Sequence, residues 1–240
     1  IVKIGEKLVE MKPEWVDTVR RLLPAYPGTG RPLDLFEREF PEVWHERFPD
    51  TPAGSYDLVA LINWGVNKDL TTNPYTMKAD AARTYSITLA DLGLDPSAEY
   101  LAFEFWDQKY LGAFKGTMEI EVPPHRAYVI ALRKKEPHPQ FIGTNRHLLT
   151  GAVGVNAISW NDKENVLSIK QEATPGTSFA PFEHRITFSV PAGWEVKNYA
   201  VSGLDKSAVT VSKGSGFGAI AFSAKEKGEV ELKVYFARGE

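Results

Sequence analysis

The feature that most constrains the fold is an alternation of apolar and polar residues, which recurs along most of the chain after Gly54. Successive side chains of a strand point to opposite faces, so this pattern predicts half-buried β-strands. Gly, Pro, Asn and Asp clusters separate the alternating stretches, and no helical pattern connects them, which favours antiparallel sandwiches. Strands are predicted at 56–64, 85–89, 100–106, 117–122 and 127–132, then at 151–160, 166–171, 184–190, 195–202, 208–213, 217–223 and 229–237.

One helix is predicted, from near Pro13 to Leu23. A proline suits the first turn of a helix, and Pro24 prevents its continuation. The apolar residues recur at helical spacing and make one stripe, which needs a partner surface to bury it. The stripe consists of Trp15, Val16, Val19, Leu22 and Leu23.

The charged, Pro-broken run Arg133–Pro139 is the predicted domain boundary. The segment 24–52 is rich in Pro, Gly and aromatic residues, which predicts irregular chain packed over a neighbouring surface. The prediction is a mainly β chain: a helical segment at 1–53, a first β-sandwich at 54–135 and a second at 136–240.

Composition excludes several function classes. The chain has 28 Lys and Arg against 31 Asp and Glu, with no long basic run, so a nucleic-acid partner is not expected. The absence of Cys excludes disulfides and thiolate metal sites. No apolar stretch reaches the roughly 18 residues of a membrane span, so no membrane partner is expected. The five His lack the i, i+4 spacing of a zinc peptidase motif, and neither metal nor cofactor is predicted.

Carboxylate pairs are the candidates for glycoside acid–base catalysis, which needs two carboxyl groups facing each other across a bond. Glu104 and Asp107 lie three apart in a predicted strand, which places them on opposite faces of the sheet. Glu42 and Glu46 have the spacing of one face of a short helical turn. Solvated or structural roles are favoured for all four, and no catalytic residue is assigned.

Two glycine-containing runs have a functional and a structural interpretation. Gly143–His147 is an unusual polar run, which either anchors a ligand or satisfies buried backbone groups at a domain junction; the junction is favoured. Gly214–Gly218 lacks the spacing of a nucleophile elbow or a dinucleotide loop, and it is interpreted as a tight hairpin turn.

Large aromatic residues provide the candidate binding surface. Sugars stack on exposed aromatic faces, so Trp160, Trp194 and Tyr199 are candidate carbohydrate-binding residues in the second sandwich. The alternative is that they fill the core or an interface. Trp64 and Trp106 stand in apolar strands and are assigned to a core.

A series of short motifs, in their order, resembles the end of the catalytic (β/α) barrel and the following β region of α-galactosidase (melibiase)-like glycoside hydrolases. The most specific is His138–His147. The others are Lys3–Leu8, Lys12–Trp15, Arg31–Glu37, Leu58–Trp64, Asp91–Leu94, Phe103–Asp107, Leu111–Gly112 and Val122–His125.

The resemblance implies that the helix is the last of the barrel. The two catalytic aspartates of such enzymes belong to earlier barrel strands, so none is carried over to this sequence. The loop Val2–Gly5 would border the sugar pocket. Ile1 in place of an initiator Met further suggests a processed or excised piece of a longer chain.

The expected function is therefore that of a non-catalytic C-terminal β-sandwich portion whose partner is the catalytic barrel. A carbohydrate-binding module, with an oligosaccharide as partner, is one alternative. An association subunit for a separate barrel is the other. Without its barrel, the helix would expose Trp15, Val19 and Leu22, which predicts either association between copies of the chain or instability of the chain in isolation.

Overall fold

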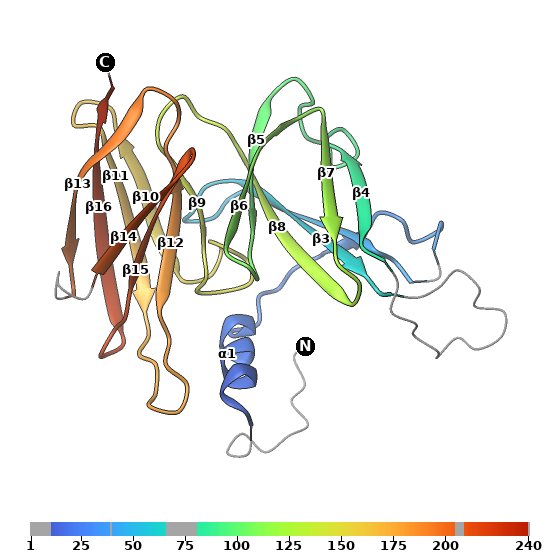
Figure 1. The fold of residues 1–240 in the computed structure, drawn as a ribbon, viewed down its shortest axis with the longest axis horizontal. Coiled ribbons are helices and arrows are strands. Elements are labelled where there is room, and N and C mark those ends of the chain that lie inside the picture. The colour runs from blue at the N-terminus through green and yellow to red at the C-terminus, as the bar shows by residue number, and fades with distance from the viewer. Residues whose placement is uncertain (1–10, 39, 66–80, 205–208, 240) are drawn as a thin grey trace. The chain divides into compact units, whose positions relative to one another are not determined.

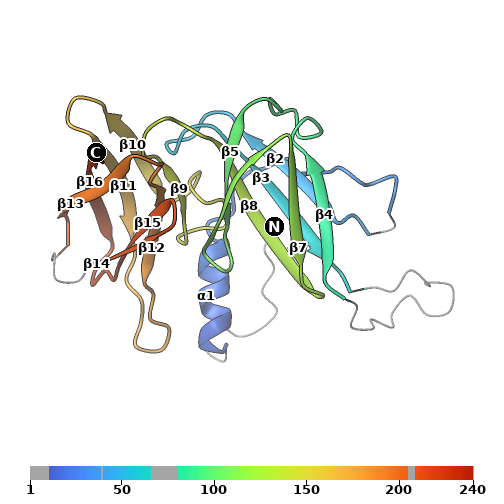
Figure 2. The same cartoon turned by 45° about the horizontal axis from the view of Figure 1, so that its top comes forward.

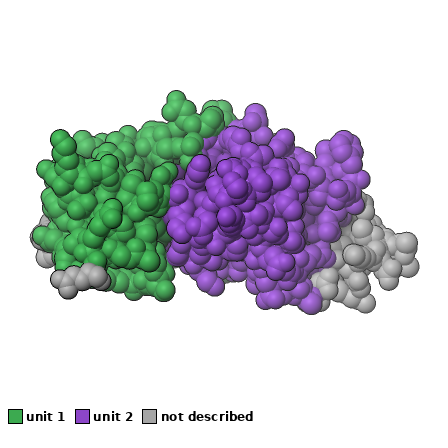
Figure 3. All heavy atoms as spheres, turned by 90° about the horizontal axis from the view of Figure 1, so that it is seen from above, with its two compact units in different colours: residues 1–27, 49–55, 136–240 green, residues 28–48, 56–135 purple. Residues whose placement is uncertain are grey.

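The computed structural model describes residues 11–38, 40–65, 81–204 and 209–239. The chain divides into two compact units, which Figure 3 draws in different colours. The central unit comprises Gly28–Phe48 and Tyr56–Lys135. The C-terminal unit comprises Ile1–Pro27, Pro49–Ser55 and Glu136–Glu240. The predicted loop Val2–Gly5 lies outside the described residues.

The central unit is a sheet of eight antiparallel strands in the order β1-β2-β3-β8-β5-β6-β7-β4 (Figures 1 and 2). Figure 2 shows β4 beside β7, with which it pairs from Arg83 to Thr88. Strands β6 and β7 pair only where the chain turns, at Lys115 and Thr117. The strands are β1 (Arg31–Pro32), β2 (Val43–Phe48), β3 (Tyr56–Asn63), β4 (Arg83–Thr88), β5 (Glu99–Glu104), β6 (Lys109–Lys115), β7 (Thr117–Val122) and β8 (Arg126–Lys134).

The core of the central unit joins the two ends of this sheet. Alternate residues of β7, such as Met118 and Val122, are fully buried, as the period-two pattern requires. They cluster with Val59 and Leu61 of β3 and with Ile130 of β8. The sheet therefore folds over on itself and encloses one apolar layer.

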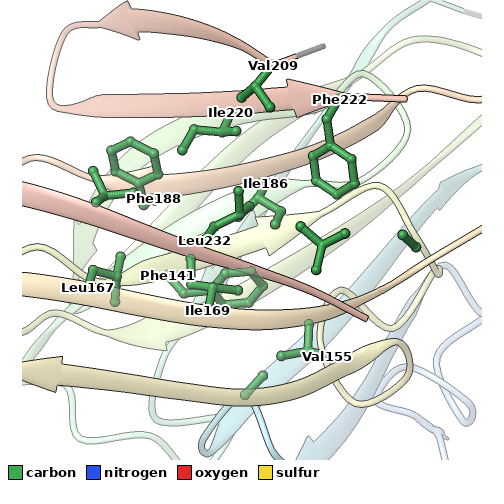
Figure 4. Close-up of a cluster of buried hydrophobic side chains, with 14 of the residues drawn as sticks. Phe141, Val155, Leu167, Ile169, Ile186, Phe188, Val209, Ile220, Phe222 and Leu232 are labelled. Carbon is green, nitrogen blue, oxygen red and sulfur yellow. The ribbon is translucent and has the colours of Figure 1, made fainter. Parts of the chain in front are cut away.

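The C-terminal unit consists of two four-stranded antiparallel sheets, ordered β10-β11-β16-β13 and β14-β15-β12-β9. Their inward-facing side chains make one core, shown in Figure 4, in which Phe188, Ile186, Leu232 and Ile169 are fully buried. The strands are β9 (Phe141–Thr144), β10 (Val155–Asn161), β11 (Val166–Ala173), β12 (His184–Ser189), β13 (Trp194–Ser202), β14 (Val209–Gly214), β15 (Phe217–Phe222) and β16 (Gly228–Arg238).

The helix α1 spans Pro13–Leu22, one residue shorter than predicted. Its first turn contains Glu14 and its last turn Arg20 and Arg21, which suits the helix dipole. None of its residues is fully buried, and Trp15 is 47% exposed. Of the three side chains expected to be exposed, Trp15 is exposed, whereas Val19 and Leu22 are half-buried. Among the described residues, no helix combines the length and the apolar character needed to cross a bilayer.

The prediction of a mainly β, antiparallel fold with one short helix is confirmed. The hairpin predicted at Gly214–Gly218 is also present: Gly214 pairs with Phe217. Gly216 has a φ of 76°, in the region that glycine adopts without a steric penalty. A Cβ at Gly214 would lie 2.2 Å from the ring of Phe217.

The segment 24–52 differs from its expected irregular form. Residues 43–48 are a strand, not a helical turn, because they pair with β3 from Val43 to Phe48. His45 is buried at an inward-facing position of this strand. Because His45 is polar, the sequence does not show the alternation of apolar and polar residues that predicts a strand. Residues 28–48 thus belong to the central unit, and 49–55 group with the C-terminal unit. Strands β6 and β9 were likewise not predicted.

Trp64 is not a core residue. Its side chain is exposed, tilts against the ring of Phe40 at a centroid distance of 6.3 Å, and donates a hydrogen bond from Nε1 to Pro41 O at 3.1 Å. It lies just after β3, which ends at Asn63, so the inward alternation of the strand does not extend to it. Trp106 is half-buried in the turn that follows β5, with its ring edge-on to Phe105.

Replacement of Phe188 tests the core of the C-terminal unit. Phe188→Ala removes a fully buried ring that packs edge-on against Phe236. The expected loss in the free energy of unfolding is about 3–5 kcal/mol, measured by urea denaturation with tryptophan fluorescence. Phe179 is 54% exposed, and Phe179→Ala is expected to change stability by no more than about 0.5 kcal/mol. Equal losses in both variants would contradict this description of the core.

Candidate functional site

Glu104 and Asp107 lie at the turn that follows β5. Strand β5 ends at Glu104, so the parity of a strand does not apply to Asp107. The buried Glu104 carboxylate accepts hydrogen bonds from the backbone N–H of Trp106 at 3.0 Å, of Asp107 at 2.6 Å and of Val129 at 3.3 Å. Burial raises the pKa of Glu104, and these hydrogen bonds oppose the shift. Asp107 pairs with Arg126 at 2.8 Å. The structural interpretation of the pair agrees with these contacts.

A second pair of buried carboxylates, Asp34 and Glu42, lies at the edge of the central unit. Arg38 lies 3.3 Å from Asp34 and 3.1 Å from Glu42, and Arg83 also pairs with Glu42. Tyr85 donates a hydrogen bond from its hydroxyl to Glu42 at 3.1 Å. Burial is the main cause that raises the pKa of Tyr85 to about 12, and the Glu42 charge adds to it. A pocket of about 550 Å³ opens beside these side chains.

Both carboxylate pairs are therefore occupied by hydrogen bonds and ion pairs. Glycoside hydrolysis requires one carboxyl group as an acid and another as a base or nucleophile, facing an open sugar site. In the described part of the chain, no group of three or more His, Cys, Asp or Glu side chains is arranged to hold a metal ion.

A third buried pair, His45 and Asp57, was not found by sequence analysis. His45 Nε2 lies 2.7 Å from Asp57 Oδ1, and Arg47 Nε donates to the same oxygen at 3.1 Å. The residues occupy the neighbouring strands β2 and β3 and are twelve positions apart. A separation of this size across a hairpin has no sequence signature. The cluster connects two strands at the edge of the core.

The polar run at 143–147 attaches the end of α1 to the sandwich of the C-terminal unit. His147 Nε2 lies 2.9 Å from Pro24 O, and the backbone N–H of Leu148 donates to Arg21 O at 2.8 Å. Arg20 donates a hydrogen bond to Ala180 O at 3.2 Å. The first two contacts satisfy the carbonyls of Arg21 and Pro24 at or just beyond the helix end, where carbonyls lack intrahelical partners.

His184 is at the centre of a buried network in the same unit. Its Nδ1 lies 3.2 Å from Gln171 Nε2, and Gln171 Oε1 accepts a hydrogen bond from Thr144 at 2.9 Å. Its Nε2 lies 3.0 Å from both the N and the O of Thr174. Burial lowers the pKa of His184 to about 4, the Thr174 hydrogen bond opposes this shift, and the charges of Arg146 and Arg20 add to it.

This pKa predicts acid sensitivity. Because the pKa of His184 in the folded state is about 4, against 6.5 for an ordinary His, the unfolded state binds the proton first. Its stabilisation is complete above pH 6.5 and decreases by about 3 kcal/mol as the pH falls to 4. His184→Gln is expected to flatten this slope in urea denaturation curves recorded across that range.

The exposed His125 provides the control for this measurement. His125→Gln is expected to retain the slope of the unchanged chain. An unaltered slope in His184→Gln would show that other groups cause the acid sensitivity.

The candidate carbohydrate-binding residues Trp160, Trp194 and Tyr199 are all half-buried and pack against the core of the C-terminal unit. Trp160 and Trp194 come together edge-to-face, with ring centroids 5.5 Å apart. Tyr199 lies on β13 opposite Val234, a buried core residue. The structure thus brings together Trp160 of β10 and Trp194 of β13, and it places Tyr199 further along β13.

Another side chain lies against the ring of each tryptophan. His138 stacks on Trp160 at 4.7 Å with an interplanar angle of 2°, and the Arg238 guanidinium lies 5.0 Å from the Trp194 ring centroid. Trp194 Nε1 donates to Pro137 O at 3.1 Å. This aromatic cluster closes one end of the sandwich. These contacts resemble those of core-filling aromatics.

The central unit exposes a group of large apolar side chains, called here the apolar patch: Leu35, Phe36, Phe40 and Trp64. The Phe36 side chain is 98% exposed. Large aromatic rings that stay in contact with water are uncommon, and exposed apolar groups often mark interaction surfaces. Sequence analysis placed this segment over a neighbouring surface but did not identify these side chains as exposed.

Comparison with known proteins bears on the central unit. Residues 42–132 match the family model described as "Alpha galactosidase C-terminal beta sandwich domain". Over this segment, which contains β2 to β8, the resemblance inferred from the sequence is confirmed. The segment is similar to the C-terminal β-sandwich domain of α-galactosidase-like proteins.

The other comparisons add little. A crystal structure of alpha-galactosidase I from Mortierella vinacea matches with 18% sequence identity and a TM-score of 0.29. The match covers 44% of this chain and 23% of that chain, so the chain spans less than a quarter of the enzyme's length. No curated protein matches the sequence.

Proposed function

We propose that the chain is the non-catalytic C-terminal portion of an α-galactosidase-like glycoside hydrolase and supports the barrel that hydrolyses α-glycosidic bonds. The observation that carries this proposal is the family match at 42–132, which covers most of the central unit. The occupied carboxylate pairs support the non-catalytic part of the proposal, because each is held by structural hydrogen bonds and ion pairs.

The apolar patch is the surface proposed to contact the barrel. Its residues lie at or just beyond the ends of β1, β2 and β3, and the exposed ring of Phe36 offers the largest unburied aromatic surface among them. Burial of such side chains removes apolar area from water at about 25 cal/mol per Å². Aromatic residues in the middle of an interface often dominate its binding energy. Trp15 on α1 is a further exposed aromatic side chain, in the C-terminal unit.

No observation favours either of the two alternatives, a carbohydrate-binding module or an association subunit. A carbohydrate-binding module would present open aromatic faces, whereas Trp160 and Trp194 carry His138 and Arg238 on their rings. An association subunit for a separately encoded barrel would use the same apolar patch. The gene that encodes the chain tests this alternative. A barrel encoded in the same reading frame would exclude a separately encoded barrel.

The first test is catalytic inactivity. The full chain is expected to give no hydrolysis of aryl α-galactosides or aryl α-glucosides above the buffer rate, measured by release of the chromogenic phenol. Hydrolysis that disappears in Asp107→Asn or Glu42→Gln would overturn the proposal, because it would place the reacting groups in this chain.

The second test concerns the apolar patch. The double variant Leu35→Ser, Phe36→Ser is expected to weaken the complex with the α-galactosidase-type barrel about tenfold or more in analytical ultracentrifugation, since two buried apolar contacts are lost. Its own unfolding free energy is expected to change by no more than about 0.5 kcal/mol, because both side chains are exposed.

The control is Phe179→Ser, which changes an exposed ring of the C-terminal unit. It is expected to leave the affinity unchanged. An equal loss in both variants would indicate general adhesion of exposed aromatics, and no loss in either would exclude the patch as the contact surface.

A further inference from the structure

The sheet of the central unit is interrupted between β6 and β7. Strand β6 pairs with β5 from Lys109 to Lys115, and β7 pairs with β4 from Thr117 to Val122. The two strands pair with each other only at their turn, where Lys115 lies opposite Thr117. Within the described residues, each strand therefore has an open edge, along which backbone N–H and C=O groups belong to no ladder.

A cleft of about 370 Å³ lies between these open edges. Lys109 and Leu111 line it from β6. Three consecutive residues of β7 also line it, Glu119, Ile120 and Glu121, although their side chains alternate between an exposed and a buried face. The cleft is therefore bordered by the edge of β7 and not by one of its faces.

The inner wall of the cleft is apolar. Leu111, Phe114 and Tyr128 line it, are half-buried, and pack against the core of the central unit. An open strand edge beside apolar side chains is an arrangement to which extended peptides bind by adding a strand. Main-chain hydrogen bonds then supply affinity, and alternate side chains of the peptide supply specificity.

The outer face of β7 carries two negative charges. Glu119 and Glu121 are exposed and lie two positions apart on the same face of the strand. Their neighbours across the ladder on β4 are Ser86 and Thr84, which are uncharged. Neither glutamate forms a salt bridge in the described part of the chain. Opposite charges on directly facing residues of neighbouring strands stabilise the pairing of the two strands.

The other charges at the cleft have the same sign on balance. Glu104 and Asp107 also line the cleft; Glu104 accepts three backbone hydrogen bonds, and Asp107 pairs with Arg126. Against four carboxylates, the described lining contains one lysine. Burial is the main cause that raises the pKa of Tyr128, and the charges of Asp107 and Glu104 add to the shift. The cleft therefore favours a cationic partner.

We propose that this cleft is a docking site for an extended basic peptide segment, which adds a strand to the open edge of β7. Basic side chains of the segment lie beside Glu119 and Glu121 on the outer face, and the alternate, apolar side chains cover Leu111 and Phe114. The strand satisfies the unpaired backbone groups of β7. The inference does not rest on the proposed function, because the cleft shares no residue with the apolar patch.

The experiment is calorimetric titration of the full chain with an acetylated and amidated heptapeptide that alternates lysine and valine. Saturable binding of one peptide is expected, and its affinity should fall as sodium chloride is added. A peptide with glutamate in place of lysine is expected not to bind. The lysine peptide with methylated backbone nitrogens is expected to bind at least about tenfold more weakly, since it lacks N–H donors. Equal affinity of the methylated peptide, or no binding of the lysine peptide, would overturn the proposal.

The double variant Glu119→Gln, Glu121→Gln tests the charges. It is expected to weaken binding of the lysine peptide about fivefold, since two exposed charge pairs are lost. Its thermal unfolding midpoint should stay unchanged, because both side chains are exposed.

The matched control is Glu37→Gln, Asp91→Asn, which removes the same charge from exposed positions of the central unit outside the cleft. It is expected to retain the affinity of the unchanged chain. Equal losses in the two double variants would indicate long-range attraction alone and would contradict docking in the cleft.

Amide hydrogen exchange locates the bound peptide. Exchange is expected to slow at residues 117–122 when the lysine peptide is bound, because the strand protects backbone N–H groups of β7. Protection confined to another strand would overturn the assignment. Sedimentation of the chain without peptide tests a second copy as the occupant. A dimer that Glu119→Gln, Glu121→Gln dissociates would assign the edge to that copy and overturn the peptide proposal.

Discussion

Burial of alternate strand residues between antiparallel layers is the interaction on which the rest of this structure depends. In the central unit it joins β7 to β3 and β8 through residues such as Met118 and Leu61. In the C-terminal unit it joins two sheets around Phe188 and Leu232. Successive side chains of a strand point to opposite faces, so some polar groups become buried at the edges of each core. Buried polar groups need hydrogen-bond partners.

The buried polar groups at those margins differ in how completely they are satisfied. Glu104 closes a turn through three backbone N–H groups, and His184 has partners on both ring nitrogens. Arg146 stands apart, because its Nε and Nη1 atoms have no hydrogen-bond partner among the described residues. A protein interior rarely leaves a buried charge in this condition.

The family similarity and the chemistry belong to different parts of the chain. The match at 42–132 covers strands β2 to β8 of the central unit. The exposed Phe36 belongs to the same unit but precedes the matched residues. The C-terminal unit holds the aromatic cluster around Trp160 and the buried Arg146.

The sequence by itself determined the mainly β fold, α1 and the hairpin at Gly214, because each rests on a local signal: alternation, an apolar stripe bounded by prolines, and glycines at a turn. Only the tertiary structure decided that residues 43–48 are a strand, that Trp64 is exposed and that Arg20 lies over Phe182. The partners lie outside the local pattern, because β3 begins beyond the end of β2 and Phe182 is distant from Arg20 in the chain. Local patterns hold no information about pairs formed across such distances, so packing alone decides them.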